Sequence, residues 1–211
     1  MGVTGNGVRV YGVELVRGDA AHGNGDPQLV PFRDLAAVVR QAPYAAVQPT
    51  PEELADYRAT VDGVFRRGTI VPAPFGTVMR SREQVLRWLE MNYIALAEGL
   101  QFVHGRCQAR LHIGESPDVL PEERRADVAA VAEESFRALR RQVAAAIPMR
   151  ADRADGTSPG YGGAFLVRRS AWADLAEAVA EQARRHESLC FELTGPWPPY
   201  DFVRVDFGGG H

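Results

Sequence analysis

Lysine is absent from this chain: all 24 basic residues among its 211 are arginines. The absence excludes a Schiff-base lysine, a lysine general base and the lysine of a phosphate-binding loop. The 27 acidic residues give a formal net charge of -3. A weakly acidic chain of this kind is not an electrostatic nucleic-acid binder, so we expect no nucleic-acid partner.

Cysteines, clustered histidines and long apolar runs are also scarce. Cys107 and Cys190 stand too far apart for a zinc motif or a disulfide framework, and we expect buried, reduced thiols. The five histidines are scattered without metal-binding spacing, so we expect neither a metal nor a cofactor. No apolar run approaches the ~20 residues of a membrane helix, and the first residues lack the features of a signal peptide. These absences predict a cytoplasmic protein without a lipid-membrane partner.

Catalytic motifs are missing as well. Neither Ser116 nor Ser170 sits in the G-x-S-x-G pattern of a hydrolase nucleophile. The glycine clusters at 23–25 and 160–163 lack the lysine and the strand–helix context of a phosphate loop, and we interpret them as loops. We therefore predict no catalytic residues and a protein that is not an enzyme. An enzyme remains an alternative, because a fold does not fix a function.

Hydrophobic periodicity in the first half predicts an α+β unit. Two helices begin at capping signals, Thr50-Pro-Glu-Glu53 and Ser81-x-x-Gln84, and end at Gly68 and Gly105. The segments with the alternation or short apolar runs of strands are 8–16, 28–32, 34–41 and 69–71.

The second half predicts a different unit. From residue 105 onward the order is strand, helix, strand, strand, helix, strand, which is that of a ferredoxin-like (βαββαβ) domain. Right-handed crossovers would place both helices on one face of a four-stranded sheet. We therefore predict an α+β chain with an N-terminal α+β domain at 1–104 and a ferredoxin-like domain at 105–211. The expected elements are strands at 107–113, 147–153, 164–169 and 189–193, a helix from Pro121, a helix capped by Ser170, and a loop at 155–163.

The most unusual stretch is Thr194–Val203, which contains three prolines, one glycine and three aromatic residues. Proline fixes its own φ and disfavours a helical residue before it, so this segment is stiff and extended or turned. Trp197 and Tyr200 have large apolar bodies with a polar edge. Two interpretations stand: the rings cover the protein's own core, or they form an edge that binds a partner.

Several motifs resemble one family. The sequence Gly195-Pro-Trp-Pro-Pro-Tyr200 followed by Phe202 resembles the C-terminal signature of the gas vesicle GvpL/GvpF family. Ile70–Val78 resembles its central Pro-x-x-Phe-Gly-Thr motif, and Ala164–Val167 resembles the strand before its last helix. The N-terminal segments Val10–Val13 and Asp34–Val39 fit the same family, and all five matches fall in the family's order.

This resemblance implies an accessory or structural protein of the gas vesicle, the organelle that gives buoyancy. Members bind the small hydrophobic shell protein, interact with other gas vesicle accessory proteins and take part in assembly, in the cytoplasm and at the vesicle. The resemblance also implies the two-domain fold given above. We expect the partner-binding contacts to come from Trp197, Pro198, Pro199, Tyr200, Phe202 and Phe75. A ligand-sensing regulatory module on a ferredoxin-like fold is the alternative function.

Overall fold

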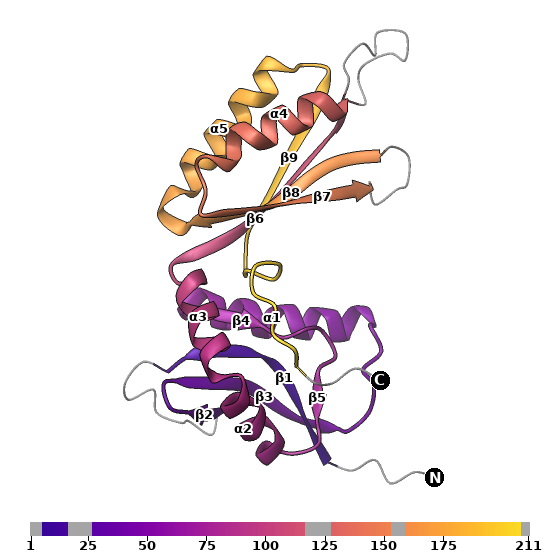
Figure 1. The fold of residues 1–211 in the computed structure, drawn as a ribbon. Helices are drawn as coiled ribbons and strands as arrows, with labels where there is room; N and C mark the ends of the chain where they lie inside the picture. Colours follow the sequence, from indigo (N-terminus) through magenta and orange to yellow (C-terminus); the bar gives the residue numbers. More distant parts are fainter. Residues whose placement is uncertain (1–5, 17–26, 117–127, 153–158, 208–211) are drawn as a thin grey trace. The chain divides into compact units, whose positions relative to one another are not determined.

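A computed structural model describes residues 6–16, 27–116, 128–152 and 159–207 (Figure 1). The chain forms two compact units: unit 1 comprises Met1–His104 together with Pro198–His211, and unit 2 comprises Gly105–Trp197. The last part of the chain thus groups with unit 1, whereas the sequence predicts one division at residue 104. The proline-aromatic stretch is divided between the two units at Trp197.

Unit 1 is built on an antiparallel sheet with strand order β2-β3-β1-β4, and β5 pairs with β1 beside β4. Residues pointing to both faces of β1 are buried, so both faces of this central strand are covered. The bounds are β1 Asn6–Leu15, β2 Gln28–Phe32, β3 Leu35–Pro43, β4 Ile70–Pro72 and β5 Val78–Met79. The predicted strands of this half are confirmed, while the predicted loop at 23–25 lies outside the described residues.

Three helices pack on this sheet: α1 (Pro51–Arg67), α2 (Arg82–Met91) and α3 (Tyr93–Val103). The Thr50 side chain caps α1 by accepting a hydrogen bond from the backbone N–H of Glu53, as the sequence predicts. The single helix predicted from 81 to 105 is wrong, because the chain breaks at Asn92. There the side-chain amide of Asn92 donates to the Trp88 carbonyl over 2.9 Å.

Unit 2 has an antiparallel four-stranded sheet of order β7-β8-β6-β9. Its helices α4 and α5 contact each other and lie on the same face of the sheet (Figure 1). The bounds are β6 Arg106–Glu115, α4 Val128–Arg140, β7 Ala145–Asp152, β8 Pro159–Arg168, α5 Trp172–Arg185 and β9 Leu189–Trp197. A single 3-10 turn, Arg169–Ala171, precedes α5.

Three details of unit 2 differ from the sequence-based expectations. The glycine-rich stretch at 160–163 belongs to β8 and is no loop: a Cβ on Gly163 would lie 2.1 Å from the Phe136 ring, so glycine lets α4 approach the strand closely. Ser170 lies in the 3-10 turn and does not cap α5. Gln108 is fully buried, although it alternates along the strand with the buried Cys107 and Ala109 and so lies on the other face of the sheet. The predicted helix start at Pro121 lies outside the described residues.

Together the units give a mixed α+β fold with two antiparallel sheets and, in the described ranges, five α-helices. This confirms the predicted α+β class. In those same ranges no helix is both long and apolar enough to cross a membrane.

Candidate functional site

Trp197 is the last residue of β9 and is 42% exposed. Its indole N–H donates to the Thr194 hydroxyl over 3.3 Å, which orients the ring along the strand end. Two residues earlier, Gly195 has a φ of +129°. A Cβ there would lie 2.8 Å from the Trp172 ring and 2.9 Å from the Gln108 carbonyl oxygen, so only glycine fits. The backbone is therefore closely packed at Gly195, two residues before the exposed Trp197.

The residues after Trp197 pack within unit 1. Pro198 and Pro199 are buried, and Phe202 is half-buried. Further along, the Asp206 carbonyl accepts a 2.7 Å hydrogen bond from the Trp88 indole, and Phe207 stacks on the same indole with ring centroids 4.5 Å apart. The tail is thus held by polar and apolar contacts at its far end.

Tyr57 on α1 links the two remaining predicted site residues, Phe75 and Tyr200. Its ring lies 5.7 Å from Phe75 in an edge-to-face arrangement and 6.5 Å from Tyr200. Tyr11 on β1 adds a fourth ring, stacked 6.2 Å from Tyr57. We name Tyr11, Tyr57, Phe75 and Tyr200 the Tyr57 cluster. The structure therefore brings Phe75 and Tyr200 together within unit 1, while Trp197 belongs to unit 2.

Two buried or half-buried arginines border this cluster, and sequence reasoning missed both. Arg9 on β1 and Arg40 on β3 stand directly opposite each other in the antiparallel register. Like charges in that position repel, but Glu53 bonds to Arg9 and Asp56 bonds to Arg40. The Arg9 guanidinium also lies 5.1 Å from the centroid of the Tyr11 ring. The signal in the sequence is an arginine inside an otherwise apolar strand.

Proton affinities in the cluster follow from these contacts. Burial and a 2.8 Å hydrogen bond to Asp56 raise the pKa of Tyr11 to about 12. Burial also raises the pKa of Tyr57, whose hydroxyl donates to the Ala73 carbonyl. Burial opposes ionisation of Asp56, but its bonds to Tyr11 and Arg40 outweigh it and lower the pKa. Both phenols stay protonated and the carboxylate stays charged near neutral pH, which suits a fixed structural network.

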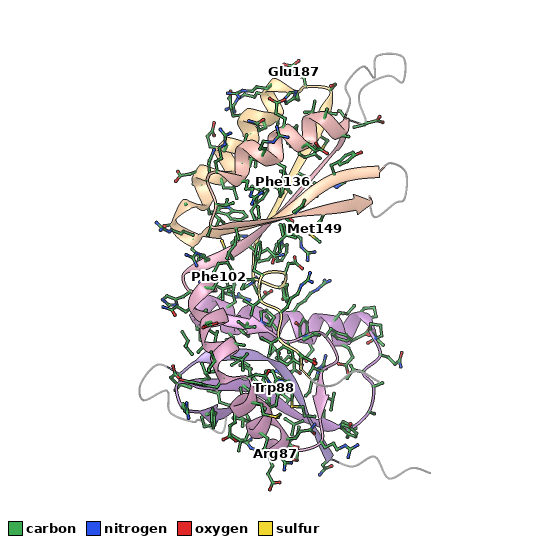
Figure 2. The ribbon with its side chains drawn as sticks, viewed as in Figure 1. Arg87, Trp88, Phe102, Phe136, Met149 and Glu187 are labelled. Atoms are coloured by element: carbon green, nitrogen blue, oxygen red, sulfur yellow. The ribbon has the colours of Figure 1, made fainter. Side chains whose placement is uncertain are left out.

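The described surface also has two shallow apolar cavities, one in each unit. The cavity in unit 1 has a volume of about 400 Å³ and includes Trp88, Met91 and Phe207 in its lining. The cavity in unit 2 has a volume of about 370 Å³ between α4 and the β7–β8 pair, with Phe136 and Met149 in its lining (Figure 2). Among the described residues no cluster of His, Cys, Asp or Glu could hold a metal ion. Burial raises the pKa of the Cys107 thiol to about 11, which keeps it protonated.

Comparison with solved structures shows the fold first: two gas vesicle proteins share it. The crystal structure of the gas vesicle protein GvpF from Anabaena sp. PCC7120 matches with a TM-score of 0.77 and 16% identity, over 98% of this chain and 99% of that one. GvpF from Microcystis aeruginosa matches with a TM-score of 0.70 and 15% identity, over 94% and 99%. A search of curated proteins found no match.

Comparison of the sequence with family profiles identifies the family of this chain. Residues 7–123 and 108–204 match the profile of the family described as gas vesicle synthesis protein GvpL/GvpF. The matched segments include most of the chain, and the chain belongs to this family. The resemblance carried by the proline-aromatic stretch and the other motifs is thereby confirmed.

Proposed function

We propose that this gas vesicle protein is a non-enzymatic accessory protein that binds the small hydrophobic shell protein and takes part in gas vesicle assembly. Its place would be the cytoplasm and the growing vesicle, beside other accessory proteins. A shell subunit with a very apolar surface is prone to aggregate until it polymerises. A protein that covers part of that surface would keep the subunit available for addition to the shell. Family membership supports the gas vesicle role.

The exposed indole of Trp197 is the observation on which the contact proposal rests. A large aromatic ring that is 42% exposed at the end of a strand offers contact area with little loss of side-chain freedom. Pro198 and Pro199 stiffen the backbone that follows, and Tyr200, Phe202 and Phe75 add aromatic surface in unit 1. We propose that the aromatic side chains contact the shell protein and that the buried Pro198 and Pro199 hold the backbone of the segment.

Co-purification with the shell protein tests this function. The wild type and the variants Trp197→Ala and Tyr200→Ala, singly and combined, would each be co-expressed with it. Tyr44→Ala is the matched control, because Tyr44 is 44% exposed and lies outside the proposed contact. We expect capture by the wild type and the control, and at least a fivefold loss for the folded double variant.

The single variants separate the two units. Loss with Trp197→Ala alone would locate the contact on unit 2, and loss with Tyr200→Ala alone would locate it on unit 1. Unchanged capture by the folded double variant would refute the contact and leave the shell-binding role intact. Failure of the wild type to capture the shell protein would refute the role itself.

We also infer that unit 2 is a ferredoxin-like domain. Its elements follow the order βαββαβ, and the two central strands of its sheet are the first and third of the unit. Both helices lie on one face. This arrangement is the one that right-handed split βαβ units produce.

A further inference from the structure

β9 forms an edge of the sheet in unit 2. Its inner side pairs with β6, and no strand in the described part of the chain pairs with its outer side. The backbone N–H of Ser116 donates to the Ser188 carbonyl over 3.1 Å. This bond shows which residues of β9 direct their backbone N–H and C=O groups toward β6. Residues at every second position therefore turn their backbone groups toward β6, and the intervening ones turn them away. The N–H and C=O groups of Phe191 and Leu193 point outward.

The other sheet edges carry the features that protect natural edge strands. β2 contains Pro31, β7 contains Pro148, and β4 is only three residues long and ends in Pro72. Short length and proline both discourage the pairing of a further strand. The run Leu189–Thr194 in β9 contains no proline, no glycine and no arginine. Among the described edges of comparable length, β9 is the one open to addition of a strand.

The charge of β9 indicates which strand would fit. Glu192 is exposed, and it is the one charged residue of the strand. The sequence has no arginine from residue 186 to 203, so a second copy of β9 would offer no basic side chain to Glu192. A partner strand with an arginine or lysine opposite Glu192 would complete a favourable cross-strand pair. Self-pairing is therefore disfavoured relative to a basic partner.

We propose that the outer edge of β9 accepts an extended segment of the shell protein by strand addition, with a basic side chain of that segment opposite Glu192. The proposal rests on the proposed shell-binding function and supplies its binding mode. Main-chain hydrogen bonds to Phe191 and Leu193 hold the segment, and Glu192 sets its register. Trp197 is the last residue of the same strand and is exposed.

Charge reversal tests the pairing in the full-length chain. Glu192→Arg changes an exposed side chain and leaves the backbone ladder to β6 intact. Glu187→Arg is the matched control, because Glu187 is exposed and lies just outside β9 (Figure 2). We expect Glu192→Arg to lower co-purification of the shell protein at least fivefold and Glu187→Arg to leave it within twofold of wild type. Equal capture by both folded variants would overturn the proposal while the shell-binding function stands.

Amide hydrogen exchange gives an independent readout of the backbone bonds. In the complex with the shell protein, the amides of Phe191 and Leu193 should exchange at least tenfold more slowly than in the free chain. Those of Cys190 and Glu192, which face β6, should change little. Absence of protection in a captured complex overturns strand addition, and protection that appears in the chain alone with rising concentration overturns it in favour of self-pairing. If wild type captures no shell protein, the proposed function fails instead.

Discussion

The hydroxyl of Tyr11 on β1 donates a 2.8 Å hydrogen bond to the carboxylate of Asp56 on α1, 45 positions further along the chain. Asp56 also accepts from Arg40 on β3, so one carboxylate joins a helix to two strands. Arg9 stands 3.9 Å from the same carboxylate. The charge of Asp56 therefore offsets the repulsion between two arginines that the register of the sheet places face to face.

Replacing Asp56 by Asn should destabilise unit 1. The amide oxygen can still accept a hydrogen bond, but the negative charge that balances Arg40 is lost. Because the Asp56 side chain is 40% exposed, water compensates in part, and we expect a loss of about 1 kcal/mol in the free energy of unfolding. Urea denaturation measures this loss. Glu52→Gln, an exposed neighbour on the same helical turn, is the control and should change the midpoint little.

The same carboxylate should make stability depend on pH in acid. The pKa of Asp56 is lowered in the folded chain below its ordinary value of 3.8, so its contribution is present above that value and is lost as pH falls through the folded pKa. The difference in urea midpoint between wild type and Asp56→Asn should therefore shrink as pH falls below about 4. A difference that stays constant from pH 7 to pH 3 would contradict the assignment.

Ionisation of Tyr11 should make the stability of the folded chain decrease as pH rises in alkali. The pKa of Tyr11 is raised from 10.0 to about 12 in the folded chain, so the contribution of the neutral phenol is complete below pH 10.0 and is lost as pH rises toward 12. Tyr11→Phe cannot ionise at this position and should show a shallower loss of stability over that range. Absorbance of tyrosinate near 295 nm, followed with unfolding, would show whether ionisation and loss of structure coincide.

Two glycines should respond in opposite directions to the same substitution. A Cβ on Gly163 would meet the Phe136 ring at 2.1 Å and the Ile147 carbonyl oxygen at 2.8 Å, and Phe136 is itself stacked on Phe165. Gly163→Ala should cost about 1–3 kcal/mol or more through overpacking. In Gly63→Ala the nearest neighbouring atom is 3.7 Å away inside α1, so the helix should gain about 0.5–1 kcal/mol. Equal thermal stabilities of the two variants would refute this packing.

Much of the fold can be predicted from the sequence because local signals and tertiary packing agree. Thr50 with Pro51 marks the start of α1, and alternation over Cys107–Ile113 marks β6. Prediction failed where a tertiary contact decides the local structure. Gly163 is paired on both sides within the sheet and leaves the space of a side chain to the Phe136 ring. The helix breaks at Asn92, whose side chain bonds to the Trp88 carbonyl.

The candidate site was partly predictable for a similar reason. Proline and aromatic composition singles out Trp197 and Tyr200, but it does not show that they belong to different units. Neither Arg9 nor Arg40 belongs to a sequence motif. Their role depends on the strand register that places them opposite each other, and a single sequence does not reveal that register. Long-range ion pairs of this kind need the pairing of strands to be known first.

Two serines are predicted from the sequence to cap helices, but in the structure only one of them does so. This difference provides a direct test. The Ser81 hydroxyl accepts a hydrogen bond from the backbone N–H of Gln84 over 3.2 Å and caps α2. Ser170 lies in the turn before α5, whose N-cap position is Ala171 without a side-chain bond. Ser81→Ala should therefore cost about 1 kcal/mol of unfolding free energy. Ser170→Ala should change it by less than about 0.5 kcal/mol. Urea unfolding followed by circular dichroism measures both, and a larger loss for Ser170→Ala would restore the cap that the sequence predicts there.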